Sequence, residues 1–247
     1  LFCKNVKKQM TVALTGECAD EIFGGYPWFF REDALKSNTF PWSISLTERQ
    51  KLLNPYIGNK INLKEYIDYR YQERLSEVEI LDSDSPETAE KRKISHLTLN
   101  WFMQTLLDRS DRMAMYNGFE LRVPFCDYRL AQYVWNIPWE WKALKGREKG
   151  LLRFICKDFL PEDIIYRKKS PYPKTHNPTY LAKIKQMLTK IMEDKNAPIN
   201  DLLNHDYILE ILNTDGKAFS RPWFGQHMVV HKLMAYLCKV NIWLEKY

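Results

Sequence analysis

The sequence LTGECADEIFGGY, at positions 14–26, places a glycine turn and several carboxylates directly behind a short strand-like run. Residues Thr11 to Leu14 are predicted to form that strand and to be buried. Gly16 permits a sharp turn after it, at the carboxyl edge where open α/β sheets bind their ligands. The stretch therefore predicts a ligand site at the junction of a strand and a helix.

Three carboxylates follow this turn at positions that one helix face would bring together. Glu17, Asp20 and Glu21 have the spacing i, i+3 and i+4, so a helical turn would place them side by side. Their hard oxygen atoms suit magnesium, and we expect them to converge on one cation. The alternative from spacing alone is an acidic helix N-terminus, which the helix dipole favours.

Positions 14–26 resemble the signature L-S-G-E-G-x-D-E-hydrophobic-F-G-G-Y of the synthetase domain of glutamine-dependent asparagine synthetases. Thr15 stands where the family usually has serine and keeps the hydroxyl, whereas Cys18 replaces a glycine and adds a side chain at a tight turn. Three other segments are similar to family motifs: 111–127, 146–153 and 167–174. The resemblance spans about residues 12–178.

The resemblance implies a mainly α fold, the helical C-terminal portion of an α/β ATP-pyrophosphatase (adenine nucleotide alpha hydrolase-like) synthetase domain. Residues 1–26 would be a remnant of its nucleotide-binding α/β part, with one strand near residues 11–14, and residues 27–247 would be mostly helical. The family's pyrophosphate-binding S-G-G-x-D-S loop and its N-terminal glutaminase domain do not occur in the sequence. We therefore expect the chain to be a fragment, and the lone strand agrees, since one strand cannot pair its own backbone groups. We expect this fragment to be inactive alone, because the loop that holds the pyrophosphate is missing.

The same resemblance implies that the whole enzyme uses ATP and magnesium to convert aspartate to asparagine. The reaction would pass through an aspartyl adenylate, and ammonia would come from glutamine. Asp20 matches a metal-binding aspartate. Glu17 matches the glutamate beside the acyl adenylate, where it would take a proton from ammonia, and Lys149 matches a lysine that contacts phosphate oxygens during adenylation. The residues that match nucleotide-contacting positions are Leu14, Thr15, Gly16 and Lys149.

Other interpretations of these residues stay open. Another acyl-adenylating synthetase, such as a β-lactam synthetase or a peptide cyclase, would retain Glu17, Asp20 and Lys149 and change the acid substrate. A non-catalytic helical interaction module, such as an RNA binder, would show salt-sensitive nucleic-acid affinity and would tolerate substitution of Glu17. Lys149 could be a solvated lysine at a helix start. Residues 108–112 could form a surface ion-pair row, but the match to the family favours a buried structural network.

The composition indicates a globular chain with an anionic substrate. Hydrophobic residues make up 45% and aromatic residues 14% of the 247 residues, which argues against disorder. Lysine and arginine number 37 against 31 acids. The excess is concentrated partly at Lys142 to Lys149 and at Arg167 to Lys174, which suits ATP and does not require a nucleic acid. The second run contains prolines and suits a loop bordering the ATP site.

The cysteines and the hydropathy pattern bear on location and partners. Five cysteines at unrelated spacings predict reduced thiols and a cytoplasmic protein. No apolar run approaches membrane-spanning length, so no membrane partner is expected. The expected partners are therefore small-molecule substrates and the glutaminase domain, and a homodimer stays open.

Helical periodicity continues through the rest of the chain. Ser85 is predicted to be an N-cap, with Pro86 at the first helical position and Glu87 favoured by the helix dipole. The face that this helix is expected to bury carries Ile94, Leu97, Trp101 and Leu106. Further helices are expected at residues 148–159, 180–192, 201–212 and 224–244.

Overall fold

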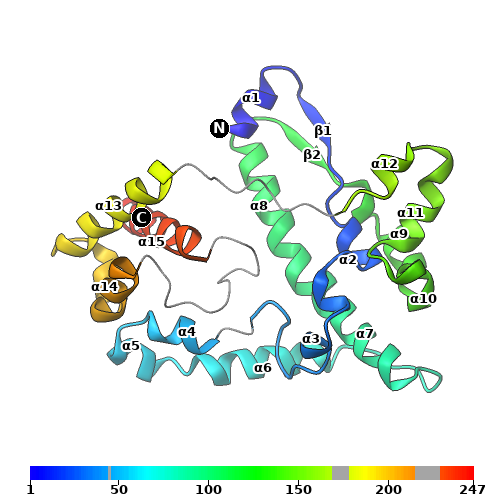
Figure 1. Cartoon of the computed structure of the whole chain (residues 1–247), viewed down its shortest axis with the longest axis horizontal. Coiled ribbons are helices and arrows are strands. Elements are labelled where there is room, and N and C mark those ends of the chain that lie inside the picture. The colour runs from blue at the N-terminus through cyan, green and yellow to red at the C-terminus, as the bar shows by residue number, and fades with distance from the viewer. Residues whose placement is uncertain (44–45, 169–177, 215–228) are drawn as a thin grey trace. The chain divides into compact units, whose positions relative to one another are not determined.

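The computed structural model describes residues 1–43, 46–168, 178–214 and 229–247 and is mainly helical, as expected (Figure 1). The chain divides into two compact units, each built from two segments that are distant in sequence. Unit 1 combines Leu1–Pro41 with Tyr71–Lys168, and unit 2 combines Trp42–Arg70 with Lys169–Tyr247. The division of the nucleotide-binding part at residue 26 stays a prediction.

Unit 1 carries the signature stretch and most of the short elements. Its helices and strands are α1 (Phe2–Lys7), β1 (Val12–Leu14), α2 (Ala19–Phe23), η1 (Pro27–Phe29), α3 (Glu32–Leu35), α7 (Pro86–Leu97), the π-helix η2 (Thr98–Phe102), α8 (Met103–Met115), β2 (Glu120–Arg122), η3 (Pro124–Cys126), α9 (Tyr128–Trp135), α10 (Trp139–Lys142), η4 (Leu144–Gly146), α11 (Gly150–Ile155), η5 (Cys156–Asp158) and α12 (Glu162–Ile165).

Unit 2 is built only of helices in its described part. They are α4 (Leu46–Lys51), α5 (Pro55–Lys60), α13 (Pro178–Glu193), the 3-10 helix η6 (Pro198–Asp201), α14 (His205–Asn213) and α15 (Val229–Lys246). The helix α6 (Leu63–Leu75) begins in unit 2 and ends in unit 1.

The predicted strand forms, and it pairs in parallel with a second strand that the sequence did not indicate. Val12, Ala13 and Leu14 of β1 lie opposite Glu120, Leu121 and Arg122 of β2. The expectation that β1 is buried is wrong, because the side chains of Val12 and Leu14 are 40% and 73% exposed. The partner strand β2 pairs with one edge of β1 and covers neither of its faces. The side chains of alternate residues, Val12 and Leu14, therefore stay open to solvent.

The helix start at Ser85 is confirmed. The Ser85 hydroxyl accepts a hydrogen bond from the Thr88 backbone N–H at 3.2 Å, and Pro86 occupies the first helical turn. Ile94 and Leu97 are buried, as the periodicity predicted. The helix does not end there, because the π-helical turn η2 joins α7 directly to α8.

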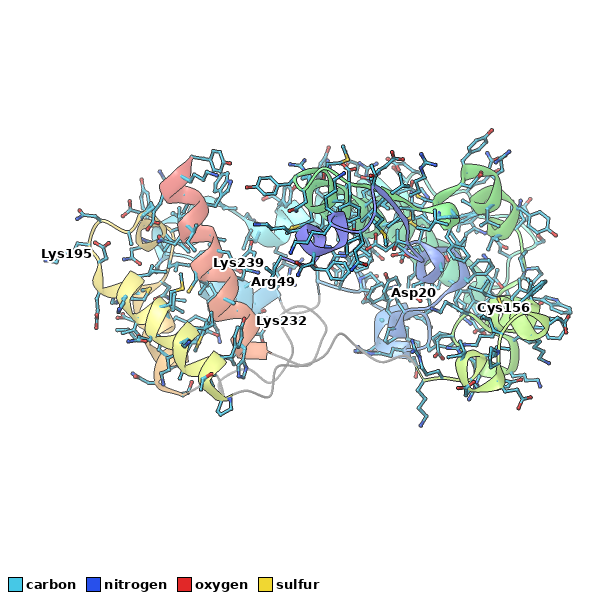
Figure 2. All side chains as sticks on the ribbon, turned by 90° about the horizontal axis from the view of Figure 1, so that it is seen from above. Asp20, Arg49, Cys156, Lys195, Lys232 and Lys239 are labelled. Carbon is cyan, nitrogen blue, oxygen red and sulfur yellow. The ribbon has the colours of Figure 1, made fainter. Side chains whose placement is uncertain are left out.

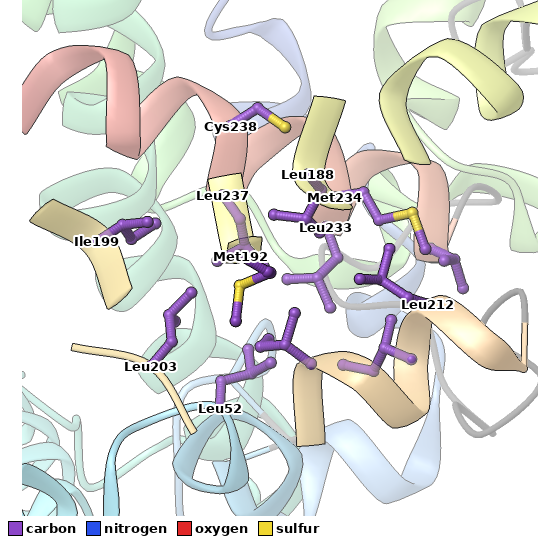
Figure 3. Close-up of a cluster of buried hydrophobic side chains, with 13 residues drawn as sticks. Leu52, Leu188, Met192, Ile199, Leu203, Leu212, Leu233, Met234, Leu237 and Cys238 are labelled. Carbon is purple, nitrogen blue, oxygen red and sulfur yellow. The ribbon is translucent and has the colours of Figure 1, made fainter. Parts of the chain in front are cut away.

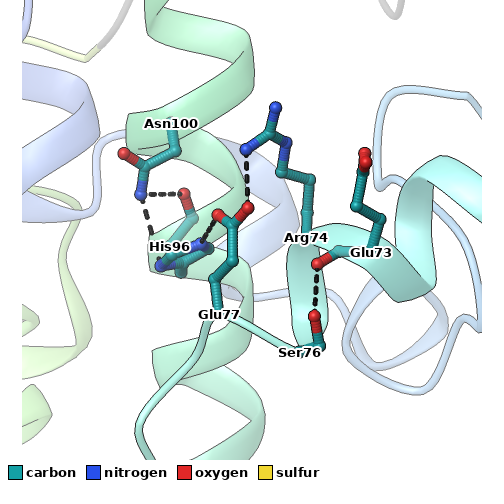
Figure 4. A network of polar contacts seen from close by, with 6 residues as sticks. All are labelled: Glu73, Arg74, Ser76, Glu77, His96 and Asn100. Atoms are coloured by element: carbon teal, nitrogen blue, oxygen red, sulfur yellow. Dashed lines mark hydrogen bonds and ion pairs between the residues drawn. The ribbon is translucent and has the colours of Figure 1, made fainter.

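A polar network holds the end of α7 and the start of η2 (Figure 4). Glu77 accepts a hydrogen bond from Arg74 Nη1 at 2.8 Å, and its other oxygen lies 3.4 Å from His96 Nε2. Asn100 Nδ2 donates to the His96 carbonyl at 3.2 Å. The hydrogen bond from Arg74 and, to a lesser degree, the contact with His96 hold the pKa of Glu77 below its usual range.

The π-helical turn in turn contacts the segment that follows the signature. Trp28 Nε1 donates to the Thr98 hydroxyl at 3.3 Å, and the ring of Phe102 packs edge-on against Tyr26 and Trp28. Thr98 and Phe102 of the π-helical turn therefore contact Tyr26, at the end of the signature stretch, or Trp28, which follows it.

The core of unit 2 is the largest buried hydrophobic cluster in the described chain (Figure 3). Leu188 of α13 and Leu233 and Met234 of α15 are fully buried in it. Leu52 reaches the same cluster from the other segment of unit 2. The neighbouring Leu53 forms an isolated β-bridge with Leu203, which fixes the two segments together.

The expected helices form with shifted boundaries. The helix predicted at 180–192 is confirmed as α13, whereas the one at 148–159 is divided into α11 and the 3-10 turn η5. The helix predicted at 201–212 begins only at His205, and α15 accounts for the described part of 224–244, since residues 224–228 lie outside the described ranges. All five cysteines are free thiols. Within the described ranges, no helix is both long and apolar enough to cross a membrane.

Candidate active site

The turn after β1 is built from backbone hydrogen bonds and one unusual residue. Thr15 N–H continues the strand pairing by donating to the Arg122 carbonyl at 3.0 Å. The Thr15 hydroxyl accepts from the Glu17 N–H at 3.3 Å, which closes a tight turn over Gly16. α2 begins only at Ala19, one residue after the turn.

Cys18 adopts the left-handed conformation that glycine adopts at low cost. Its φ is +74° and its ψ is −15°, and its side chain is 2% exposed. This backbone conformation explains why the related signature has glycine at this position, since a Cβ atom is unfavourable there. Burial and, secondarily, the neighbouring Cys126 thiol raise the pKa of Cys18, so this thiol is held in its protonated form.

The expectation that three carboxylates converge on one cation is wrong. Because Cys18 is left-handed, Glu17 lies outside α2 and the helical spacing does not apply to it. Glu21 is 2% exposed and accepts a hydrogen bond from the Tyr26 hydroxyl at 2.6 Å. Burial and then the charge of Glu21 raise the pKa of Tyr26. Across the part of the chain that the structure describes, no three acidic, histidine or cysteine side chains group together as a metal site.

Glu17 is held by two residues of α8. Its Oε1 atom accepts from the Ser110 hydroxyl at 2.8 Å and from Arg109 Nη2 at 3.2 Å. Its Oε2 atom is buried and has no hydrogen-bond partner among the described residues. Buried carboxylate oxygens are normally paired, so this atom is available to a ligand that donates a proton or a hydrogen bond.

Asp20 and Lys149 form an ion pair across the site. Lys149 Nζ lies 2.8 Å from Asp20 Oδ1, and the two side chains are 25% and 23% exposed. Asp20 is labelled in Figure 2, which draws the surrounding side chains. These two residues, predicted separately as the phosphate-binding cation and the metal-binding carboxylate, are therefore in contact.

The backbone around Lys149 is also strained. Lys149 has a φ of +54° and caps α11, and a Cβ atom on the next residue, Gly150, would lie 2.3 Å from the Leu144 nitrogen. Among the described residues only Cys18, Lys145 and Lys149 have positive φ without being glycine. Strained backbone of this kind concentrates at functional sites, and two of these three residues belong to this one.

The two glycines near the end of the signature allow two other side chains to approach the backbone closely. A Cβ atom on Gly25 would lie 1.9 Å from Asp20 Oδ1, and the Gly25 N–H donates to the Asp20 carbonyl at 2.7 Å. Gly24 has a φ of +70°, and a Cβ atom there would lie 2.4 Å from the Trp139 ring. Gly25 therefore leaves room for the Asp20 carboxylate, and Gly24 leaves room for the Trp139 ring.

These features coincide with a match over nearly the whole chain. The family model named asparagine synthase matches residues 1–245. The chain belongs to the asparagine synthase family. Asparagine synthetase (glutamine-hydrolyzing) 3 of Bacillus subtilis (strain 168) is 47% identical over 246 residues, which cover 100% of this chain and 40% of that protein. Asparagine synthetase (glutamine-hydrolyzing) 1 of the same bacterium is 29% identical over 238 residues, which cover 85% of this chain and 37% of that protein.

The likeness to mammalian members of the asparagine synthase family is more local. The human asparagine synthetase (glutamine-hydrolyzing) is 37% identical over 91 residues, which cover 36% of this chain and 16% of that protein. The chain thus spans about two fifths of the length of the first relatives it matches.

Sequence reasoning missed the residues that hold Glu17. Arg109 was assigned to a buried network over 108–112, whereas Arg112 and Asp108 form an exposed pair, 77% and 61% exposed. That assignment is wrong, because Asp108 and Arg112 pair on a solvent-exposed face of α8, whereas Arg109 and Ser110 bind Glu17. Nothing in the sequence indicated that Arg109 and Ser110 act together, because their common partner, Glu17, lies on a different element of the structure.

The remaining predicted residues are placed as follows. Leu14 is 73% exposed beside Thr15, and an added Cβ on Gly16 would meet nothing within 4 Å. Both residues therefore border open space at the turn. Glu120 forms an exposed pair with Arg122 and does not reach Glu17 in the contacts that the described chain shows. Most of the basic run at 167–174 lies outside the described residues.

Proposed function

We propose that this chain supplies part of the synthetase site of an enzyme that makes asparagine from aspartate, ATP and ammonia. Aspartate would attack the α-phosphorus of ATP through its side-chain carboxylate, releasing pyrophosphate and giving an aspartyl adenylate. Ammonia, generated from glutamine on another domain, would then displace AMP. The family membership of the chain and the arrangement around Asp20 support this assignment.

The contact between Asp20 and Lys149 is the observation that carries the proposal. The two residues are far apart in sequence, yet their charged atoms lie 2.8 Å apart beside the turn at Thr15 and Gly16. A compact ammonium group next to a carboxylate suits the polyphosphate of ATP, because the ammonium binds phosphate oxygens and the carboxylate binds the accompanying cation. Without nucleotide, Lys149 neutralises Asp20, and phosphate oxygens would compete for it.

Magnesium fits this site only with additional ligands. Magnesium usually binds one or two protein carboxylates together with water and substrate phosphates, and Asp20 provides one such carboxylate. When bound, the ion would neutralise the charge of the leaving pyrophosphate. Leu14, Thr15 and Gly16 would face the nucleotide from the open side of the turn, with the Thr15 hydroxyl hydrogen free to donate.

Glu17 is suited to the second half-reaction. Ser110 and Arg109 fix one of its oxygens and leave the buried Oε2 atom to accept a proton. Ammonia that attacks the adenylate must lose a proton, and a fixed carboxylate within hydrogen-bond reach would take it. Lys149 would act earlier, on the negative charge that develops on the phosphates.

The test separates the two half-reactions in the intact protein. Lys149→Met is expected to lower pyrophosphate release with ATP and aspartate by roughly a hundredfold, because it removes an electrostatic stabiliser. Glu17→Gln is expected to preserve most pyrophosphate release and to lower asparagine formation from free ammonia by a similar factor. Mass spectrometry of AMP and asparagine would also identify the product, which distinguishes asparagine from the products of other acyl-adenylating synthetases.

Matched controls remove a charge of the same sign nearby. Lys145→Met and Glu120→Gln change exposed residues outside the proposed contacts and should leave both readouts within about twofold of wild type. Near-normal asparagine formation by either site variant would refute the role assigned to that residue.

A further inference from the structure

A cavity lies in unit 1 between α7 and α10. It has a volume of about 290 Å³ and is lined by residues between Leu81 and Ser95, before and along α7, and by residues between Trp135 and Lys142, from the end of α9 to the end of α10. This volume is near the lower end of small-molecule sites, so the cavity has room for a compact metabolite.

Two buried polar side chains of this cavity make fewer hydrogen bonds than buried polar groups normally do. Five polar or charged residues are buried in the described chain, and three of them make side-chain hydrogen bonds of ordinary kind: Glu21, Thr98 and Asn241. The other two are Ser95 and Lys142, and both line this cavity. The described residues offer no hydrogen bond to the Ser95 hydroxyl, and they offer Lys142 Nζ only the Trp135 carbonyl at 3.4 Å. Buried polar groups without partners call for a ligand, an ion or water.

The positive charge of Lys142 is the more unusual of the two features. The residue is 6% exposed, and within the described ranges no carboxylate pairs with it. Burial and then the charge of Arg92 lower its pKa to about 8. A buried lysine without a counter-ion is unfavourable, and an anion in the adjacent cavity would stabilise its charged form.

The other charged groups at the cavity are already committed or lie at its rim. Arg92 binds both oxygens of Asp84, at 2.8 and 2.9 Å, and Lys91 pairs with the exposed carboxylate of Glu87 at 2.5 Å. Lys91 and Arg92 also stack over tryptophan rings of the lining. Glu140 is exposed at the edge of the cavity. Lys142 is therefore the cation of this cavity whose charge no described carboxylate neutralises, and an anionic ligand could pair with it.

We propose that this cavity binds a small oxyanion, the phosphate or carboxylate group of a compact metabolite, with Lys142 as its cationic partner and Ser95 as a hydroxyl donor. The inference is independent of the proposed synthetase activity, because the lining of this cavity includes none of the residues to which that activity is assigned. The competing explanation is structural: the Lys142 ammonium lies at the C-terminal carbonyls of α9, where the helix dipole favours a cation.

Anion titrations of the intact protein at constant ionic strength distinguish the two. Sodium sulfate, inorganic phosphate and sodium acetate are the probes, and isothermal calorimetry measures their affinities. Lys142→Met is expected to weaken binding of the best probe by roughly tenfold or more, because it removes a charge-assisted contact. Lys93→Met, on α7 but outside the cavity lining and paired with Glu90, is the control and should change the affinity less than about twofold.

The pH dependence provides a readout that a structural role would not move. Because the pKa of Lys142 is lowered to about 8, its charge is present below that pH and is lost above it. Affinity for sulfate, which keeps its charge throughout, is expected to be constant near pH 7 and to fall above about pH 8 in wild type. Lys142→Arg should retain the affinity at about pH 9, since arginine stays protonated. Binding should also take up protons near pH 8.

Several outcomes would overturn the proposal. They are an absence of saturable binding of all three probes, equal affinity of Lys142→Met and wild type for the best probe, and a wild-type affinity for sulfate that does not change between about pH 7 and about pH 9. If Lys142→Met fails to fold, the comparison of wild type with Lys142→Arg across pH still decides. Preference for sulfate and phosphate over acetate would assign a phosphate group to the ligand, and the reverse preference would assign a carboxylate.

Discussion

At the scale of single residues, one left-handed backbone position determines the geometry of the signature. The sequence identified Glu17, Asp20 and Lys149 through motifs, and the contact between Asp20 and Lys149 agrees with that grouping. The glycine that the family signature has at position 18 indicated an unusual turn, but the cysteine residue itself did not predict that its φ is +74°. That dihedral angle separates Glu17 from α2, and the burial of Glu21 against the Tyr26 hydroxyl accounts for the rest of the wrong prediction of a three-carboxylate cluster.

The cost of this backbone conformation can be measured at Cys18 itself. Cys18→Ala keeps the Cβ atom and loses the buried sulfur, whereas Cys18→Gly also removes the Cβ atom. Glycine is expected to be more stable than alanine here by about 1 kcal/mol, the reverse of their order in a helix. Urea denaturation of both variants measures the difference in the free energy of unfolding. A glycine variant less stable than the alanine variant would contradict the strain assigned to this position.

At the scale of secondary structure, capping signals were more informative than the strand signals. The helix start at Ser85 and Pro86 was predictable because a side-chain acceptor and a residue without an N–H have fixed places in the first turn. β2 was not predictable, because Glu-Leu-Arg carries no run of β-branched residues and its pairing with β1 is a long-range contact. Whether such a short segment forms a strand depends on pairing with its partner strand.

The cap of α7 gives a prediction at this scale. Ser85→Ala removes the acceptor for the Thr88 N–H and is expected to lower the free energy of unfolding by about 1 kcal/mol. Ser85→Gly should cost only a few tenths of a kcal/mol, since glycine leaves the backbone N–H groups open to water. Hydrogen exchange of the first amides of α7 would locate the loss. Equal stability of wild type and Ser85→Ala would show that the cap contributes nothing.

At the scale of the whole molecule, neither unit is continuous in sequence. The helix at 180–192 was predicted from the sequence, but no local pattern indicated that Leu52 joins the same core as Leu188. That association depends on packing between distant segments, including the bridge between Leu53 and Leu203. Helix positions were therefore accessible from the sequence, whereas the grouping of helices into units was not.

The core of unit 2 should respond strongly to a cavity. Leu233→Ala removes a fully buried side chain and is expected to lower the free energy of unfolding by about 2–5 kcal/mol. Leu209→Ala, at a residue of α14 that is 39% exposed, is the control and should cost less than about 1 kcal/mol. Chemical denaturation measures both, and amide exchange in α13 and α15 would rise only in the first. Similar losses in the two variants would show that the cluster of Figure 3 is not the main source of stability in unit 2.

The divided construction of unit 2 also affects how the protein can fold during translation. The segment that carries Leu52 leaves the ribosome well before the helices that bury it. At about 5–20 residues per second, synthesis of the chain between Leu52 and Leu188 takes on the order of ten seconds. During that interval the nascent chain presents an apolar segment without its native partners, and transiently exposed apolar surface of this kind is what chaperones protect from aggregation.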